Sequence, residues 1–288
     1  MPNRPTPRHW YANLHLRLGL RAGKTRLLSA EHLGPLRVQR PFYPEGPHCH
    51  LYWLHPPGGL VTGDELCIQA ELLPGAQALL TTPSAGKIYA ADGGCAPQRT
   101  HITLNQSAGS YLEWLPQETL VFNGANAQLN TRFNLTADAQ LLAWDIVCLG
   151  RPASQDWFDQ GRCHTGFELW RDGRPVQIER SALTGGEPIL WAPWGLGGQL
   201  TGGGSNSAHT LGTCIATLSL TRDEQDALLA ALNAQFGGPQ NRWGVTQKEA
   251  LLLVRYLGCD TAAAKAGFIH LWQTLRPALM GAEACLPR

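Results

Sequence analysis

Hydrophobic and polar residues alternate along much of the chain, and this pattern predicts strands. Leucines at 14, 16, 18 and 20 alternate with polar residues or glycine, which is typical of a half-buried strand. Residues 170–180 alternate on both sides of Asp172-Gly173, a favoured turn pair, and therefore predict a hairpin. A further strand is expected over residues 209–220.

A strand–turn–strand unit recurs in the first half of the chain. The units cover residues 64–82, 98–115 and 127–145, with turns near Gly75, Gly109 and Ala139. Turns about thirty residues apart lie in the range that is typical of stacked repeats. One such unit cannot bury both of its faces alone, so several of them would stack around a continuous core.

Helical spacing of apolar residues appears only after residue 220. Residues 221–224 form a capping box, and leucines at helical spacing follow until Gly237-Gly238. A second capping box at 246–249 predicts another helix up to residue 256, and a third helical run covers 261–275. Strands followed by helices predict a mainly β fold with a small C-terminal helical section. We divide it into a β-rich domain, 1–220, and a helical section, 221–288, that pack as one structural unit.

The composition indicates a globular chain with few charges. Of 288 residues, 43% are hydrophobic and 16% are charged, which provides for a sizeable core. The net charge of +1 gives no electrostatic footprint for nucleic acid or an anionic membrane. Few charges leave room for large uncharged contact surfaces, which favours a protein that works in a complex.

The eight cysteines are widely scattered, and we interpret them as reduced thiols packed like small hydrophobic residues. The first residues are polar and rich in proline, without the apolar segment of a secretory signal. No apolar run is long enough to span a membrane. We therefore expect a cytoplasmic protein.

Metal-ligand side chains concentrate between residues 34 and 65. The candidates are His48, Cys49, His50, His55, Asp64 and Glu65. Imidazole, thiolate and carboxylate suit nickel, zinc or copper, but the paired spacing of a strong zinc signature is absent. Packed, hydrogen-bonded histidines are the alternative interpretation. For Asp64, the alternative is a turn residue that hydrogen-bonds its own backbone.

Motifs of nucleophilic, zinc-peptidase and dinucleotide-binding enzymes are absent from the sequence. Three residues separate Gly19 from Gly23-Lys24-Thr25, whereas a phosphate loop needs four. The acidic pairs Glu113/Glu118 and Asp156/Asp159 are most simply solvated loop charges. A non-enzymatic role is therefore favoured. A stand-alone β-solenoid enzyme acting on carbohydrate is the alternative, because such folds carry acidic pairs on an exposed sheet face.

Two tryptophans lie in a stretch rich in glycine and proline. Trp191 and Trp194 are candidate anchors for a partner protein, because aromatic residues dominate interface hot spots. Packing in the core is the alternative for both.

Four long strings of the sequence resemble one family. They are HLYWLHPPGGLVTGDEL (50–66), LLTTPSAGKIYAADGG (79–94), LEWLPQETLVFNGANAQ (112–128) and LLAWDIVCLGRPASQDWFDQGR (141–162). Together they resemble the urease accessory protein D (UreD) family. The chain departs from the family pattern at Thr62, where a glycine is usual, and at Gly86, where serine or threonine usually precedes the lysine.

The resemblance implies a β-helix-like stack of strands with a helical section. It also implies a maturation factor that binds apo-urease with UreF and, through UreF, the GTPase UreG, and assists nickel insertion without catalysing a reaction. Nickel would be held transiently, with no tightly bound cofactor. A transit site needs a few exchangeable ligands instead of a closed cage. Asp64 is the first candidate ligand, because its motif matches the family and a carboxylate exchanges such an ion readily.

Overall fold

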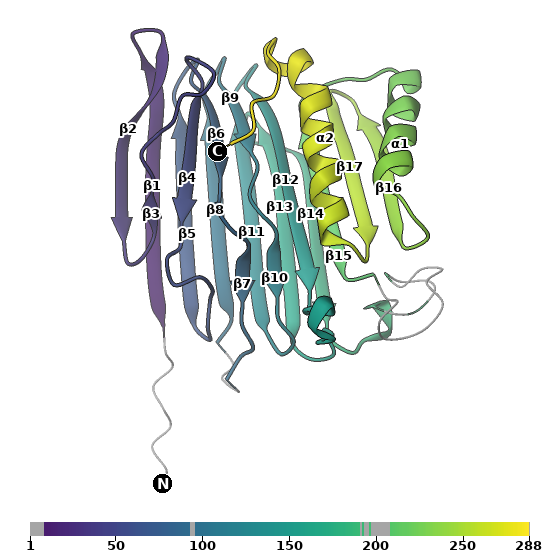
Figure 1. Cartoon of the computed structure of the whole chain (residues 1–288). Coiled ribbons are helices and arrows are strands. Elements are labelled where there is room, and N and C mark those ends of the chain that lie inside the picture. The colour runs from purple at the N-terminus through teal and green to yellow at the C-terminus, as the bar shows by residue number, and fades with distance from the viewer. Residues whose placement is uncertain (1–8, 93–95, 191, 193–195, 197–207, 288) are drawn as a thin grey trace.

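The computed structural model describes residues 9–92, 96–190, 192, 196 and 208–287 as two β-sheets and two α-helices (Figure 1). The seven-stranded sheet has the order β14 (Arg174–Thr184), β13 (Arg162–Arg171), β11 (Asn126–Leu135), β8 (Gln98–Gln106), β5 (Asp64–Leu72), β1 (Trp10–Arg21) and β2 (Lys24–Leu33). The ten-stranded sheet has the order β16 (Asn241–Lys248), β17 (Leu251–Gly258), β15 (Thr210–Ala216), β12 (Gln140–Leu149), β9 (Tyr111–Trp114), β6 (Gln77–Thr81), β4 (Cys49–Leu54) and β3 (Arg37–Val38). Two further strands belong to this sheet: β10 (Thr119–Val121) pairs with β12, and β7 (Gly86–Ile88) pairs with β10. The mainly β prediction is confirmed.

Within each repeat unit, the first strand (β5, β8 or β11) lies in the seven-stranded sheet and the next (β6, β9 or β12) in the ten-stranded sheet, so that each unit forms one rung of a stack. Neighbouring rungs are parallel, and their residue offset is the same in both sheets. The offset is 34 residues from β5 to β8 and from β6 to β9 (Glu65 opposite Arg99, Gln77 opposite Tyr111), and 29 residues from β8 to β11 and from β9 to β12. This arrangement confirms the repeat and the β-helix-like stack of strands.

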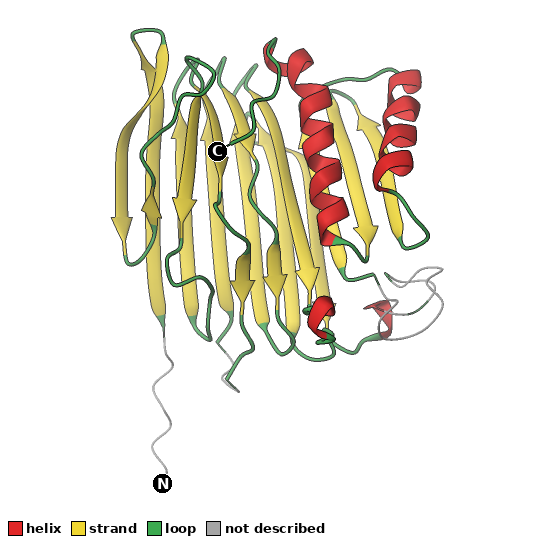
Figure 2. Cartoon of the chain, viewed as in Figure 1, coloured by secondary structure: helices red, strands yellow, loops and turns green. Residues whose placement is uncertain are grey.

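The protein has three layers, because both helices lie on the outer face of the ten-stranded sheet (Figure 2). Side chains from the facing sides of the two sheets form the inner core, which includes Leu14, Leu16 and Leu18 of β1. A second apolar cluster lies between the outer face and the helices α1 (Arg222–Phe236) and α2 (Thr261–Met280). Among the described residues, no helix is long and apolar enough to span a membrane.

The C-terminal section departs from the prediction at one point. The first capping box is present: Thr221 Oγ1 accepts the Glu224 N–H, and the Glu224 side chain accepts the Thr221 N–H. The helix predicted over 246–256 is wrong, because β16 and β17 form an antiparallel hairpin there. Residues 251–254 are all buried, since β17 lies between β15 and β16 with both of its faces covered. A continuous apolar run of this kind suits a buried strand as well as a helix.

Two strands of the ten-stranded sheet are interrupted side by side. The path of β6 continues as β7 after residues 82–85, and the path of β9 continues as β10 after residues 115–118. Each break contains a proline, Pro83 or Pro116, which cannot donate a hydrogen bond to a neighbouring strand. Thr82 instead accepts the Gln117 N–H through its hydroxyl oxygen at 2.9 Å. The two interrupted strands therefore stay linked at this level by a side-chain hydrogen bond.

Two smaller expectations also hold. Asp172 and Gly173 turn the β13–β14 hairpin with φ of 48° and 76°, the left-handed conformation that such a tight turn requires. Cysteines 49, 67, 148, 163, 214, 259 and 285, which are those the structure describes, are all free thiols.

Candidate functional site

A cavity of about 280 Å³ lies between the two sheets, beside the interrupted strands. Residues 82–88 and 116–117 form part of its wall, so the breaks in the sheet border directly on it. The side chains around it are mostly apolar, and the ionisable ones are His55, Lys87 and Asp145. The cavity can therefore admit a small polar or charged species among walls that hold it weakly.

Asp145 of β12 lines both this cavity and a second one of about 50 Å³. The second cavity is lined by Thr165, Glu179, Ser181 and Thr213, among others. Burial raises the pKa of the Asp145 carboxyl to about 6; the charge of Glu179 adds to the rise, while a hydrogen bond with the Ile146 backbone opposes it. Burial therefore opposes ionisation of Asp145, whose carboxyl group lies inside the protein in the walls of both cavities.

The ionisable groups at the two far ends of these neighbouring cavities differ in their chemistry. At one end, burial lowers the pKa of His55, partly offset by the charge of Asp64, so the imidazole is neutral at neutral pH and its nitrogen can bind a metal. At the other end, the Glu179 carboxylate is already paired: Arg255 Nη2 lies 2.9 Å from Oε2, and Thr213 Oγ1 donates to Oε1 at 2.8 Å.

Asp64 and Glu65 do not line either cavity. Asp64 is buried, its Oδ2 accepts the Val61 N–H at 3.0 Å, and its own N–H donates to the Val61 carbonyl at 3.0 Å. It therefore has the geometry of the turn residue given above as its alternative role. The Glu65 side chain lies near His9 and Arg99, at 3.3 Å and 3.7 Å, on a partly exposed part of β5.

The predicted ligands of the other group separate by strand alternation. His48 and His50 lie on one face together with Glu45, and the ligand atoms of these three residues are all within 4.8 Å of one another. Cys49 points to the other face of β4 and belongs to the core between the sheets. Burial raises the pKa of its thiol to about 11, so Cys49 is a packed neutral thiol.

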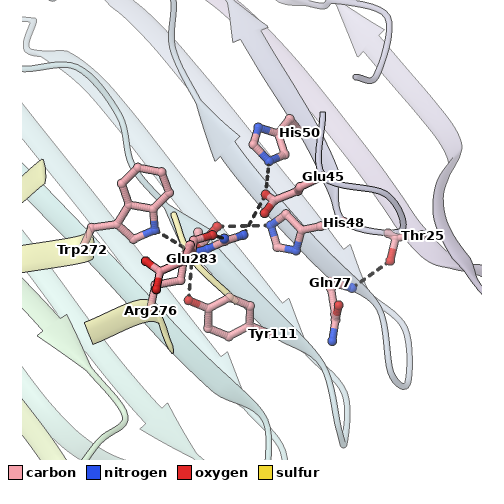
Figure 3. A network of polar contacts seen from close by, with 10 residues as sticks. Thr25, Glu45, His48, His50, Gln77, Tyr111, Trp272, Arg276 and Glu283 are labelled. Atoms are coloured by element: carbon pink, nitrogen blue, oxygen red, sulfur yellow. Dashed lines mark hydrogen bonds and ion pairs between the residues drawn. The ribbon is translucent and has the colours of Figure 1, made fainter. Parts of the chain in front are cut away.

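A buried ionic network joins this cluster to α2 (Figure 3). Arg276 donates from Nη2 to Glu45 Oε1 and from Nε to Glu113 Oε1, both at 2.7 Å. Trp272 Nε1 and the Tyr111 hydroxyl donate to the same Glu113 oxygen, at 2.6 Å and 2.9 Å. The network thereby fixes the last helix against the strands of the ten-stranded sheet.

Both carboxyl groups of this network are ionised. Burial raises the pKa of Glu113, but His48, Arg276 and Trp272 outweigh it, so that the net pKa is below the usual value. The same balance lowers the pKa of Glu45, where His50 and Arg276 oppose the effect of burial. The interpretation of Glu113 as a solvated loop charge is therefore wrong, because this side chain of β9 is fully buried.

Sequence reasoning did not find several residues of these sites. Asp145 stands alone in an apolar stretch, residues 141–149, and this was a usable signal for a buried charge. Glu45 lies three residues before His48, whereas Arg276 has no local signal. The anchor candidates Trp191 and Trp194 lie outside the described residues, so their role stays a prediction.

Comparison with known proteins places the chain among urease accessory proteins. The sequence profile described as UreD urease accessory protein matches residues 11–288. The urease accessory protein UreD of Saccharophagus degradans is 48% identical over 291 aligned residues, which cover 100% of this chain and 95% of that protein. The proteins of the same name from Chromohalobacter salexigens and Klebsiella aerogenes are 44% and 42% identical; the alignments cover 98% and 99% of this chain, and 89% and 97% of those proteins. The chain therefore belongs to the UreD urease accessory protein family.

Proposed function

We propose that this chain takes part in urease maturation as a passage for nickel, without catalysing a reaction of its own. The observation that carries this proposal is the pair of cavities that share Asp145 in their walls. A carrier needs space in its interior and ligands that release the ion again, and Asp145 offers a carboxylate in the walls of both cavities.

The chemistry of the route suits a borderline divalent ion. Asp145 contributes a single carboxylate, and His55 contributes a neutral imidazole at the edge of the larger cavity. Carboxylate and imidazole both bind nickel, and a few separated ligands hold the ion less firmly than a closed tetrahedral cage does. The ion would enter beside the strand breaks, pass Asp145 and leave toward Glu179.

The partners are proposed from the family. The resemblance implies apo-urease, UreF and the GTPase UreG, with nucleotide hydrolysis left to UreG. Residues 19–25 of this chain support that division, because they turn the β1–β2 hairpin through Ala22 and Gly23 and do not lead into a helix. The family also favours this reading over a stand-alone carbohydrate-active enzyme.

Urease produced from its complete gene cluster provides the test. Its nickel content per active site would be measured without this chain, with the wild-type chain, and with the Asp145→Asn variant. Asp159→Asn is the matched control, because the structure places Asp159 at the surface, away from both cavities.

We expect nickel-poor, inactive urease without the chain and with Asp145→Asn, and full loading with Asp159→Asn. Pull-down of UreF would show that both variants still form the complex. Full nickel loading with a folded Asp145→Asn variant would refute the passage, and full loading without the chain would refute the maturation role.

A further inference from the structure

The cluster of Glu45, His48 and His50 lies on the opposite face of β4 from the passage. Its neighbours Tyr111 and Trp272 belong to the outer apolar cluster beneath the helices, whereas Cys49, between the two histidines, belongs to the core between the sheets. The body of the ten-stranded sheet therefore separates the two sites. A function of this cluster would therefore be independent of the two cavities that Asp145 lines.

The histidines of the cluster have unused nitrogen atoms. Nδ1 of His48 and Nδ1 of His50 are buried and have no hydrogen-bond partner among the described residues, whereas His50 Nε2 lies 2.5 Å from Glu45 Oε1. His48 Nε2 lies 3.2 Å from Glu113 Oε2, but neither atom makes a hydrogen bond with good geometry. Buried polar atoms without partners are costly, and metal binding is one way in which proteins satisfy them.

The net charge of the cluster is compatible with a bound cation. Glu45 and Glu113 contribute two negative charges, and Arg276 contributes one positive charge that is bonded to both of them. Metal binding requires deprotonated imidazoles, and in that state the group carries one net negative charge. A divalent ion beside Glu45 would be attracted by this charge and would bind the imidazoles in their neutral form.

A route to the cluster also exists. A cavity of about 310 Å³ is lined by Phe42, Tyr43, Pro44, His50, Tyr52 and Pro287. Phe42 is exposed, so this cavity opens toward the protein surface, and His50 lies on its wall. The segment after α2 forms one side of the entrance through Pro287, and it is also tied to the network because Arg276 Nη1 donates to the Glu283 carbonyl.

From this geometry we infer that Glu45, His48 and His50 form a second metal site, which binds one borderline divalent ion such as Ni²⁺ or Zn²⁺. One carboxylate and two imidazoles are a common ligand set for such ions, and three protein ligands leave a position open for exchange. The site goes beyond the proposed passage and does not rest on it. It would allow the isolated chain to bind one divalent ion independently of Asp145.

Equilibrium dialysis of the isolated, full-length chain against NiCl₂ or ZnCl₂ tests this inference. The number of bound ions would be compared between the wild type, His50→Ala and the more conservative Glu45→Gln. His164→Ala is the matched control, because His164 is an exposed residue of β13. Visible absorption of the Co²⁺-loaded chain would report whether the ion has histidine ligands.

We expect the wild type and His164→Ala to bind one ion more than His50→Ala. Glu45→Gln should weaken binding by more than the roughly 10–100-fold that the loss of an outer-shell partner costs. Thermal unfolding identifies any variant that does not fold, and the other variant then decides. Equal stoichiometry and affinity in all folded variants would overturn the inference. Because urease loading is measured separately with Asp145→Asn, a failure here is distinct from a failure of the passage.

Discussion

Replacing Arg276 with methionine should destabilise the whole chain strongly. Arg276 is fully buried, and its guanidinium bonds both Glu113 and Glu45. Methionine fills a similar volume but removes the charge, so that the fully buried Glu113 would lose its guanidinium partner and its pKa would rise. The change thus isolates the electrostatic contribution of the network from its packing.

The expected magnitude follows from the burial of the pair. Breaking a buried ion pair by removing one partner costs about 3–5 kcal/mol. A protein of this size loses roughly 2–4 °C in Tm per kcal/mol, so the Tm should fall by on the order of 10 °C. Arg222→Met is the control, because Arg222 forms an exposed i,i+4 pair with Asp226 that is worth about 0.3–0.5 kcal/mol.

Urea denaturation and calorimetry of the isolated chain would measure both variants. The double variant Arg276→Met/Glu113→Gln should recover part of the loss, because it removes the uncompensated charge together with its partner. The reasoning fails if Arg276→Met costs no more than Arg222→Met. It also fails if the two single costs simply add in the double variant, since the residues would then be independent.

Three further measurements test the ion pair, a buried thiol and two glycine turns. The pKa of Glu113 in the folded protein is below 4.5, so the ionised Glu113 side chain stabilises the fold fully above pH 4.5, and this stabilisation is lost as the pH falls through the folded pKa. The urea concentration at the unfolding midpoint should therefore decrease more steeply from pH 6 to pH 3 for the wild type than for Arg276→Met. Burial raises the pKa of Cys163 to about 12, so this thiol should react with an alkylating reagent at pH 8 only after the protein unfolds. Mass spectrometry of the labelled peptide would measure this reaction, and labelling of the native chain would contradict the burial of Cys163. Gly161→Ala should cost more than the roughly 1–2 kcal/mol of a left-handed backbone alone, because the added Cβ would lie 2.3 Å from a carbonyl oxygen. Gly173→Ala, with φ +76° and open space, should cost only that strain, and equal Tm losses for both glycine variants would show that the contact is irrelevant.

The repeat could be predicted from the sequence because its determinants are local. Alternation of apolar residues gives each strand, and small polar turns near Gly75 and Gly109 give the spacing of the rungs. The helix expected over 246–256 failed because four consecutive buried residues, 251–254, fit a central strand as well as a helix. Only the pairing of β17 with β15 and β16 decides between the two, and this pairing involves residues distant in sequence.

The candidate sites could be predicted only in part, for a similar reason. Strand alternation alone would have separated Cys49 from His48 and His50, because neighbouring residues of a strand point to opposite faces. The bond between Glu113 and Arg276 joins residues 163 positions apart and leaves no local trace. Two carboxylates became part of a buried network through the docking of a helix that comes last in the chain.

The stacking of the repeat also accounts for the position of the proposed passage. A single break in one strand would be flanked by continuous neighbours and would leave little space. Because the rungs are stacked nearly in register, the break after β6 lies beside the break after β9, and residues of both breaks line the larger cavity. The residues along the route come from different rungs: His55 follows β4, Asp145 lies on β12 and Glu179 lies on β14. The proposed passage needs no contiguous sequence motif, because the stack brings together side chains from strands that are distant in the sequence.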